Sequence, residues 1–164
     1  MLRQPNPYRT LRAKLILIHV LESQPVFEFA TESDIAKLRE ERREAALQQL
    51  ASLLAPEDED DLDLKLVLKS GNARTEIAAA VQEYHADIVV LGTRGRSGLG
   101  RWFIGSTTDG LLRKLHVPVM TVCHTTSPRA FKRILFATDL SESSNAAFAF
   151  ALEMARTLQA EILA

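Results

Sequence analysis

The chain has 164 residues, of which 46% are hydrophobic and 25% charged, a composition typical of a globular domain and not of a disordered chain. Its formal net charge of −1 gives no electrostatic reason to expect nucleic acid or an anionic membrane as a partner. Cys123 is the single cysteine, which excludes an intrachain disulfide, and the longest apolar runs are too short to span a bilayer. With no recognisable signal peptide, we expect a cytoplasmic protein.

Strands and helices are predicted to alternate along the chain. Continuous apolar runs rich in β-branched residues, at 14–20 and 87–92, are typical of strands buried on both faces. The predicted strands are 14–20, 63–69, 87–92, 119–123 and 133–138, and the predicted helices are 33–54, 75–85, 106–115 and 143–158. This alternation indicates an α/β fold, with a parallel sheet and helices on both of its faces.

The first predicted helix is long and highly charged. Ser33 and Asp34 are candidate N-terminal caps, because their side-chain oxygens can accept the unpaired amide hydrogens of a first turn. A broken apolar stripe is expected to face the core, and its members are Ile35, Leu38, Ala45, Leu50 and Leu53.

The two ends of the sequence resemble each other. Residues 9–17 and 156–164 both begin with Arg-Thr-Leu, continue to an alanine two positions later and run into an apolar segment, 147 residues apart. We interpret this as a repeat of about one domain length, so that the chain begins inside one copy and stops inside the next. The expected organisation is residues 9–124 as most of one domain, 125–131 as a linker, and 132–164 as the start of a following copy.

The segment from Gly92 to Thr107 carries the strongest functional pattern. Gly92 and Gly95 are followed by nine residues and then by Gly105 and Ser106 at a predicted helix start. Glycines let a backbone approach a phosphate closely and adopt positive φ angles, and the free amides of a helix start favour an anion. The segment also leaves the carboxyl end of a parallel strand, where open α/β sheets bind ligands. Plain turn residues between a strand and a helix are the alternative interpretation.

Neither of the two common nucleotide motifs fits this segment. No lysine precedes Ser106, so it is not a Walker P-loop, and the glycine spacing differs from that of a dinucleotide fingerprint. Two glycines, a nine-residue spacer and Gly-Ser instead resemble the nucleotide motif of the universal stress protein family. Other segments of the sequence also resemble that family: Leu91-Gly92-Thr93, His116-Val117-Pro118-Val119 and the segment from Phe136 to Ser143. The resemblance extends from Thr10 to Ala164.

The resemblance implies a Rossmann-like fold of the adenine nucleotide alpha-hydrolase type, an open parallel sheet of five strands with the first strand at its centre. In that family the chain starts with the strand and helix that come last here, at 133–158. The strands therefore stand in circularly permuted order, as in a piece of a tandem-domain member. The strand at 133–138 is expected to complete the sheet of its own chain or, by swapping, that of a second chain in a homodimer.

The resemblance also implies a ligand, ATP or the related ADP or AMP, together with Mg²⁺. The residues implied for the phosphates and ribose are Gly92, Thr93, Gly95, Arg96, Gly105, Ser106 and Thr107; those implied for the adenine and ribose side are Ala137, Thr138, Asp139 and Val20. Asp139 or Ser106 would meet the metal. Arg96 and its neighbour Arg94 are equally well interpreted as solvated loop arginines.

Three functions remain open on the sequence. The first is a stress-response or signalling module that binds ATP without fast turnover, and no catalytic residue is assigned to it. The second is a slow ATPase or a nucleotidyl- or phosphoryl-transfer enzyme on the same fold, which would use the same segment. The third is a dimerisation module with a vestigial site, against which the intact glycine pattern argues.

Overall fold

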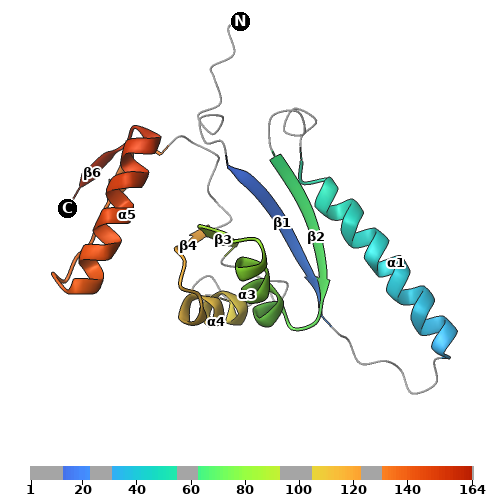
Figure 1. Ribbon diagram of the computed structural model, residues 1–164. Coiled ribbons are helices and arrows are strands. Elements are labelled where there is room, and N and C mark those ends of the chain that lie inside the picture. Colours follow the sequence, from blue (N-terminus) through green and yellow to red (C-terminus); the bar gives the residue numbers. More distant parts are fainter. Residues whose placement is uncertain (1–12, 23–30, 55–62, 93–104, 123–130, 164) are drawn as a thin grey trace, which may run out of the picture. The chain divides into compact units, whose positions relative to one another are not determined.

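The computed structural model describes residues 13–22, 31–54, 63–92, 105–122 and 131–163 (Figure 1). Residues 13–125 belong to a larger compact unit and residues 126–164 to a smaller one. The larger unit contains β1 (Lys14–Leu21), α1 (Glu32–Ala51), β2 (Asp63–Ser70), α3 (Ala73–Glu83), β3 (Val89–Gly92), α4 (Ser106–Lys114) and β4 (Val119–Val122). The smaller unit contains β5 (Arg133–Leu135), α5 (Glu142–Leu158) and β6 (Glu161–Leu163).

The described strands form three two-stranded ladders, and all three are parallel. β1 pairs with β2 over eight residues, β3 with β4 over four, and β5 with β6 over three. Parallel pairing follows from the alternation of strands and helices, and it confirms the α/β class that the sequence predicted. β5 ends three residues earlier than predicted, although the Phe136 amide still donates to the Leu163 carbonyl at 2.7 Å.

Helix α1 begins at a capping box that the sequence analysis placed wrongly. Thr31 is the N-cap: its hydroxyl accepts from the Asp34 amide at 3.2 Å, and the Asp34 carboxylate accepts from the Thr31 amide at 3.2 Å. Ser33 and Asp34 are already helical, so neither is the cap. A capping box needs an acceptor at both ends of the first turn, and here only Thr31 with Asp34 provides the two.

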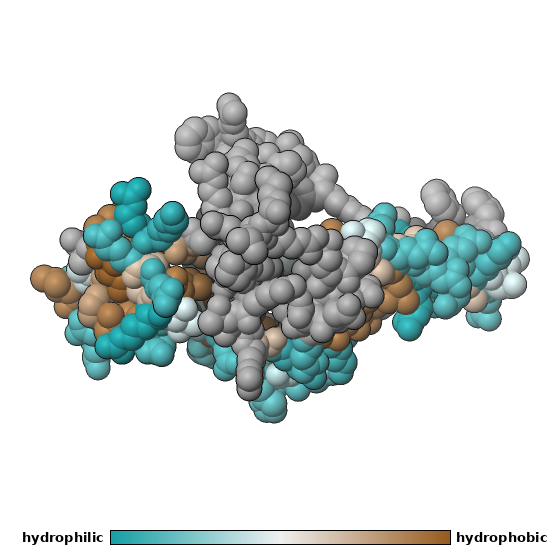
Figure 2. All heavy atoms as spheres, turned by 90° about the horizontal axis from the view of Figure 1, so that it is seen from above, coloured by the Kyte–Doolittle hydropathy of each residue, from teal (hydrophilic) through white to brown (hydrophobic). Residues whose placement is uncertain are grey.

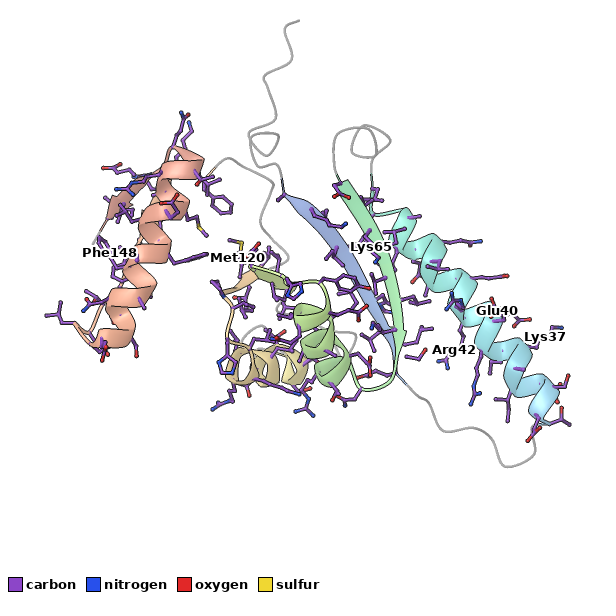
Figure 3. All side chains as sticks on the ribbon, in the orientation of Figure 1. Lys37, Glu40, Arg42, Lys65, Met120 and Phe148 are labelled. Atoms are coloured by element: carbon purple, nitrogen blue, oxygen red, sulfur yellow. The ribbon has the colours of Figure 1, made fainter. Side chains whose placement is uncertain are left out.

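The predicted apolar stripe of α1 is only partly buried. Leu50 is buried, whereas Ala45 is exposed, Leu38 is 54% exposed and Leu53 is 70% exposed; Ala46, which was not in the predicted stripe, is buried. Charged side chains surround the first half of the helix, and Lys37 and Glu40 point away from β2 (Figure 3). The expectation was wrong for Leu38, Ala45 and Leu53, because a helix polar on nearly all sides has no continuous apolar face to bury.

Helix α3 packs closely against the β1–β2 ladder. Its Ala78 and Val81 are buried, as is Val67 of β2. At the edge of this contact the Lys65 ammonium lies 4.6 Å from the centre of the Tyr84 ring, a cation–π distance. At the other end of α3 the Gly71 amide donates to the Leu21 carbonyl at 3.0 Å, which places the carboxyl ends of β1 and β2 next to the Asn72-capped start of the helix.

The prediction that residues 87–92 form a strand buried on both faces was wrong. Val90 is 59% exposed, and Ile88, just before β3, is 38% exposed. The run of apolar residues is typical of a central strand, but β3 has β4 as its only ladder partner among the described residues. The side chains of β3 alternate between the two faces of the ladder, and the face that carries Val90 is the exposed one.

The smaller unit has one covered and one open apolar face. Helix α5 covers the first face, where the rings of Phe136 and Phe148 lie 5.1 Å apart and Ala155 is buried. On the opposite face, Leu135 is 77% exposed and Leu163 is 41% exposed. Apolar side chains on the surface of this unit are visible at the left of Figure 2.

Candidate nucleotide site

The two ends of the glycine-rich segment are tied together in the larger unit. Gly92 is the last residue of β3, and α4 begins at Ser106. The Thr108 hydroxyl in the first turn of α4 donates a hydrogen bond to the Gly92 carbonyl oxygen at 3.2 Å. Residues 93–104 lie outside the described residues, and with them the candidates Thr93, Gly95 and Arg96.

The amino end of α4 has no side-chain cap. Gly105 is the N-cap, and the first backbone bond of the helix runs from the Asp109 amide to the Gly105 carbonyl at 3.0 Å. The amides of Ser106 and Thr107 precede that bond and lie where the helix dipole is positive. An anion that reached this point would meet convergent donors, with the exposed Ser106 hydroxyl beside them.

The expected positive φ is not found at this helix start. Gly105 has φ −57° and ψ 147°, an extended conformation that any residue adopts. Among the described glycines only Gly71, in the turn before α3, has a positive φ. The backbone conformation at 105 therefore does not require a glycine.

Thr108 is the residue that the sequence analysis missed. It is 5% exposed and the one buried polar residue among those described, and its hydroxyl bond to Gly92 fixes the distance between β3 and α4. Helical spacing could have found it, because Leu111, which is fully buried, lies three residues further on the same face. The sequence analysis considered only the hydroxyls next to Gly105.

The second group of candidates lies in the smaller unit, in the turn from β5 to α5. The Asp139 carboxylate accepts from the Ser141 amide at 3.0 Å and from the Ser144 hydroxyl, and these bonds hold its pKa well below the ordinary value. The Thr138 hydroxyl accepts from the Leu140 amide at 2.9 Å, and Leu140 has a φ of 63°. Ala137, Thr138 and Asp139 are all exposed.

Comparison with known proteins decides the family. The model of the universal stress protein family matches residues 8–122, more than two thirds of the chain. The chain belongs to the universal stress protein family. It is 24% identical over 117 residues to the universal stress protein MJ0531 of Methanocaldococcus jannaschii, covering 71% of this chain and 69% of that protein.

Two further matches support membership of the universal stress protein family. A universal stress protein of Thermus aquaticus is 31% identical over 116 residues, covering 67% of this chain and 77% of the relative. The solved structure of protein MJ0577 superposes with a TM-score of 0.56 at 24% identity, covering 70% of this chain and 78% of that one. This structural similarity to protein MJ0577 supports a shared fold.

The universal stress protein match divides the candidate residues into two groups. It includes Val20, one residue before the end of β1, and the segment from Gly92 to Thr107. It ends before β5, so the turn with Thr138 and Asp139 lies beyond it. The assignment of that turn to the site rests on the resemblance of the segment from Phe136 to Ser143 to the family, and it stays a prediction.

No metal centre is visible in the parts that the structure describes. They hold no group of three or more His, Cys, Asp or Glu side chains placed to bind an ion. The same ranges contain no helix long and apolar enough to cross a membrane. Ser106 and Asp139 as magnesium ligands stay a prediction.

Proposed function

We propose that the protein is a nucleotide-binding module of the universal stress protein family, which binds ATP, or ADP or AMP, with Mg²⁺. The observation that carries the proposal is the start of α4: an uncapped helix end at Gly105, joined to the carboxyl end of β3 through Thr108 and Gly92. This arrangement offers free amides and a positive dipole at the edge of a parallel ladder, where α/β proteins bind phosphates.

The proposed contacts follow the order of groups in the nucleotide. Gly105, Ser106 and Thr107 bind the phosphates, with Gly92, Thr93, Gly95 and Arg96 along the same segment. Val20 contacts the adenine, and Ala137, Thr138 and Asp139 line the adenine and ribose side. Mg²⁺ reaches the site with the phosphates, and Ser106 or Asp139 is its protein ligand.

We also propose that the five strands form one open sheet in a homodimer in which β5 is exchanged. Among the described residues β1 and β3 belong to separate ladders, and the resemblance to the family assigns its central strand to β5. A linker of seven residues, 125–131, spans at most about 25 Å. A strand of usual length is already about 17–20 Å, which makes insertion into the own sheet difficult. Exchange across a two-fold axis avoids that return path.

Binding without fast turnover is the proposed activity, in a cytoplasmic stress-response or signalling role. The alternative is a slow ATPase or a phosphoryl- or nucleotidyl-transfer enzyme. Steady hydrolysis faster than about one turnover per second, in the range of ordinary enzymes, would favour the alternative.

Native mass spectrometry of the purified protein tests the proposal. We expect the mass of an adenine nucleotide, with or without magnesium, to leave with the folded chain. The matched control is the Gly105→Val variant purified in parallel, which should carry none. A parent protein free of nucleotide, even after incubation with millimolar Mg-ATP, would contradict the proposal.

A further inference from the structure

Arg74 of α3 lies against the backbone of α4 at Gly110. It is the second residue of α3, directly after the start that Asn72 caps, and α3 contacts α4 within the larger unit (Figure 1). A Cβ built on Gly110 would collide with the Cδ atom of Arg74 and would lie 3.3 Å from its Nη1 atom. The absence of a side chain at Gly110 therefore leaves the space that Arg74 occupies.

The contact at Gly110 brings the Arg74 guanidinium towards the start of α4. Gly110 follows Ser106 by four positions, so the two residues share one face of the helix and lie about 6 Å apart along its axis. Helical side chains tilt towards the amino end, so the space over Gly110 adjoins the turn that begins at Ser106. A charge there acts on an anion at the helix start over a separation comparable to the Debye length, about 8 Å at physiological ionic strength.

The charge of Arg74 is not used to stabilise the fold. Arg74 is exposed, and no carboxylate in the described ranges pairs with it, whereas Asp109 in the first turn of α4 is paired with Arg113 at 3.3 Å. Arg74 also stands in the first turn of α3, where the helix dipole makes a cation unfavourable. An unpaired cation at a position that disfavours it indicates a role outside folding.

We propose that Arg74 supplies positive charge to the phosphates of a nucleotide bound at the start of α4, and so favours ATP and ADP over AMP. The inference rests on the proposed function and deepens it by adding a residue outside the glycine-rich segment. Attraction between a cation and an anion grows with the charge of the anion, and ATP and ADP carry more phosphate charge than AMP. Gly110 is the positioning residue, because it lets the arginine lie against α4.

Titration calorimetry with ATP and with AMP, each with and without Mg²⁺, measures this preference. Without the metal, Arg74→Gln should weaken ATP binding about threefold to tenfold and AMP binding less than twofold, and Arg74→Lys should recover most of the ATP affinity. Mg²⁺ neutralises part of the phosphate charge, so the difference should shrink when it is present. Lys114→Gln is the matched control: it removes an exposed charge from the same face of α4, about 12 Å from Ser106 along the axis, and should change neither affinity.

Gly110→Ala tests the position of the charge separately from its presence. The added Cβ must displace the Arg74 side chain, while alanine favours a helix more than glycine does, so stability should not fall. We expect ATP binding about twofold to fivefold weaker in Gly110→Ala, and no further loss when this change is added to Arg74→Gln. Denaturant unfolding of Arg74→Gln should also show no loss of stability, since the change removes a cation from an unfavourable helix start.

The outcomes separate the inference from the function on which it rests. Equal weakening of ATP and AMP by Arg74→Gln, or an equal effect of Lys114→Gln, overturns the inference. A loss of affinity that follows a loss of stability also overturns it and assigns Arg74 to packing. Binding of both nucleotides that does not depend on Arg74 rejects the inference and keeps the proposed function. A parent protein that binds neither nucleotide rejects the proposed function, and the inference with it.

Discussion

The two strand-to-helix turns that hold the candidate residues differ in how their helix amides are satisfied. At the start of α5 the protein supplies its own acceptors: the Ser141 hydroxyl accepts from the Ser144 amide at 3.2 Å, and Asp139 accepts from the Ser141 amide. At the start of α4 the N-cap is Gly105, which has no side chain to accept a bond. At the start of α5 side chains of the protein itself accept from backbone amides, whereas the start of α4 can accept an external anion.

The other described helices resemble α5 in this respect. Thr31 caps α1 and Asn72 caps α3, each through a side-chain oxygen. A negative charge is stabilised at any helix start, but a side-chain cap already occupies part of the first-turn amides, whereas an uncapped start leaves all of them to a ligand. The comparison therefore predicts that changes at the start of α4 alter ligand affinity, while changes to the caps of α1 and α3 alter stability.

The largest expected effect comes from Gly105→Val. The φ and ψ of Gly105 admit valine, so the fold should survive, while the branched side chain occupies the space of an approaching phosphate oxygen. We expect calorimetry with Mg-ATP to detect no binding. The matched control is Gly71→Ala at a φ of 143°, which should cost about 1–3 kcal/mol of stability and leave affinity unchanged. Equal losses of affinity in both variants would remove the distinction between the turns.

Ser106→Ala should weaken binding by about 1–3 kcal/mol, as for a hydrogen bond to a charged group, with little change in stability. Asn72→Ala is the reciprocal change at a capped turn, where the side chain accepts from the Thr75 amide at 3.3 Å. It should lower the free energy of unfolding by about 1 kcal/mol and leave affinity intact. Titration calorimetry and denaturant unfolding of both variants measure the two quantities separately. A stability loss in Ser106→Ala would show that its hydroxyl serves the fold.

Thr108→Val removes the hydroxyl that joins α4 to the Gly92 carbonyl while keeping the side-chain volume. We expect it to lower the free energy of unfolding by about 0.5–1.5 kcal/mol, and also to weaken Mg-ATP because the two halves of the site are no longer held together. Thr108→Ser keeps the donor and should recover the affinity. An affinity that fails to recover in the serine variant would assign the effect to packing next to Leu111.

Asp139→Asn should have a small effect on the stability of the fold, and this effect should depend on pH. The folded pKa of this carboxyl is depressed, so its charged form contributes stability above the unfolded pKa of about 3.9 and loses it as pH falls towards the folded pKa. Thermal melts should show the variant less stable than the parent at pH 7 and equal to it in strong acid. A difference that is constant with pH would mean that charge is irrelevant to this turn.

The fold class followed from the sequence because it depends on local patterns. Alternating apolar runs and helical segments placed every described strand within a few residues, and the repeat placed the start of β6. Burial was harder to predict, because it depends on partners. The run at 87–92 is typical of a central strand, yet Val90 is 59% exposed, and in the part of the chain that the structure describes β3 pairs with β4 alone.

The sequence predicted the two glycines at the ends of the candidate segment but not the hydrogen bond that joins those ends. Gly92 and Gly105 stand out by spacing, but the bond from Thr108 to Gly92 joins residues 16 positions apart and appears only once the strand and helix are placed. The α1 cap was missed for a similar reason: Thr31 and Ser33 are equally good acceptors by type, and only the reciprocal bond with Asp34 decides between them.

Thermal unfolding with and without Mg-ATP tests the central claim most directly, that the open start of α4 binds an adenine nucleotide. At a nucleotide concentration about a hundred times the dissociation constant, linkage adds roughly 2.7 kcal/mol to the free energy of unfolding. We predict that Mg-ATP raises the melting temperature of the parent protein and of Asn72→Ala and leaves that of Gly105→Val unchanged. A parent protein whose melting temperature is the same with and without millimolar Mg-ATP would contradict the account.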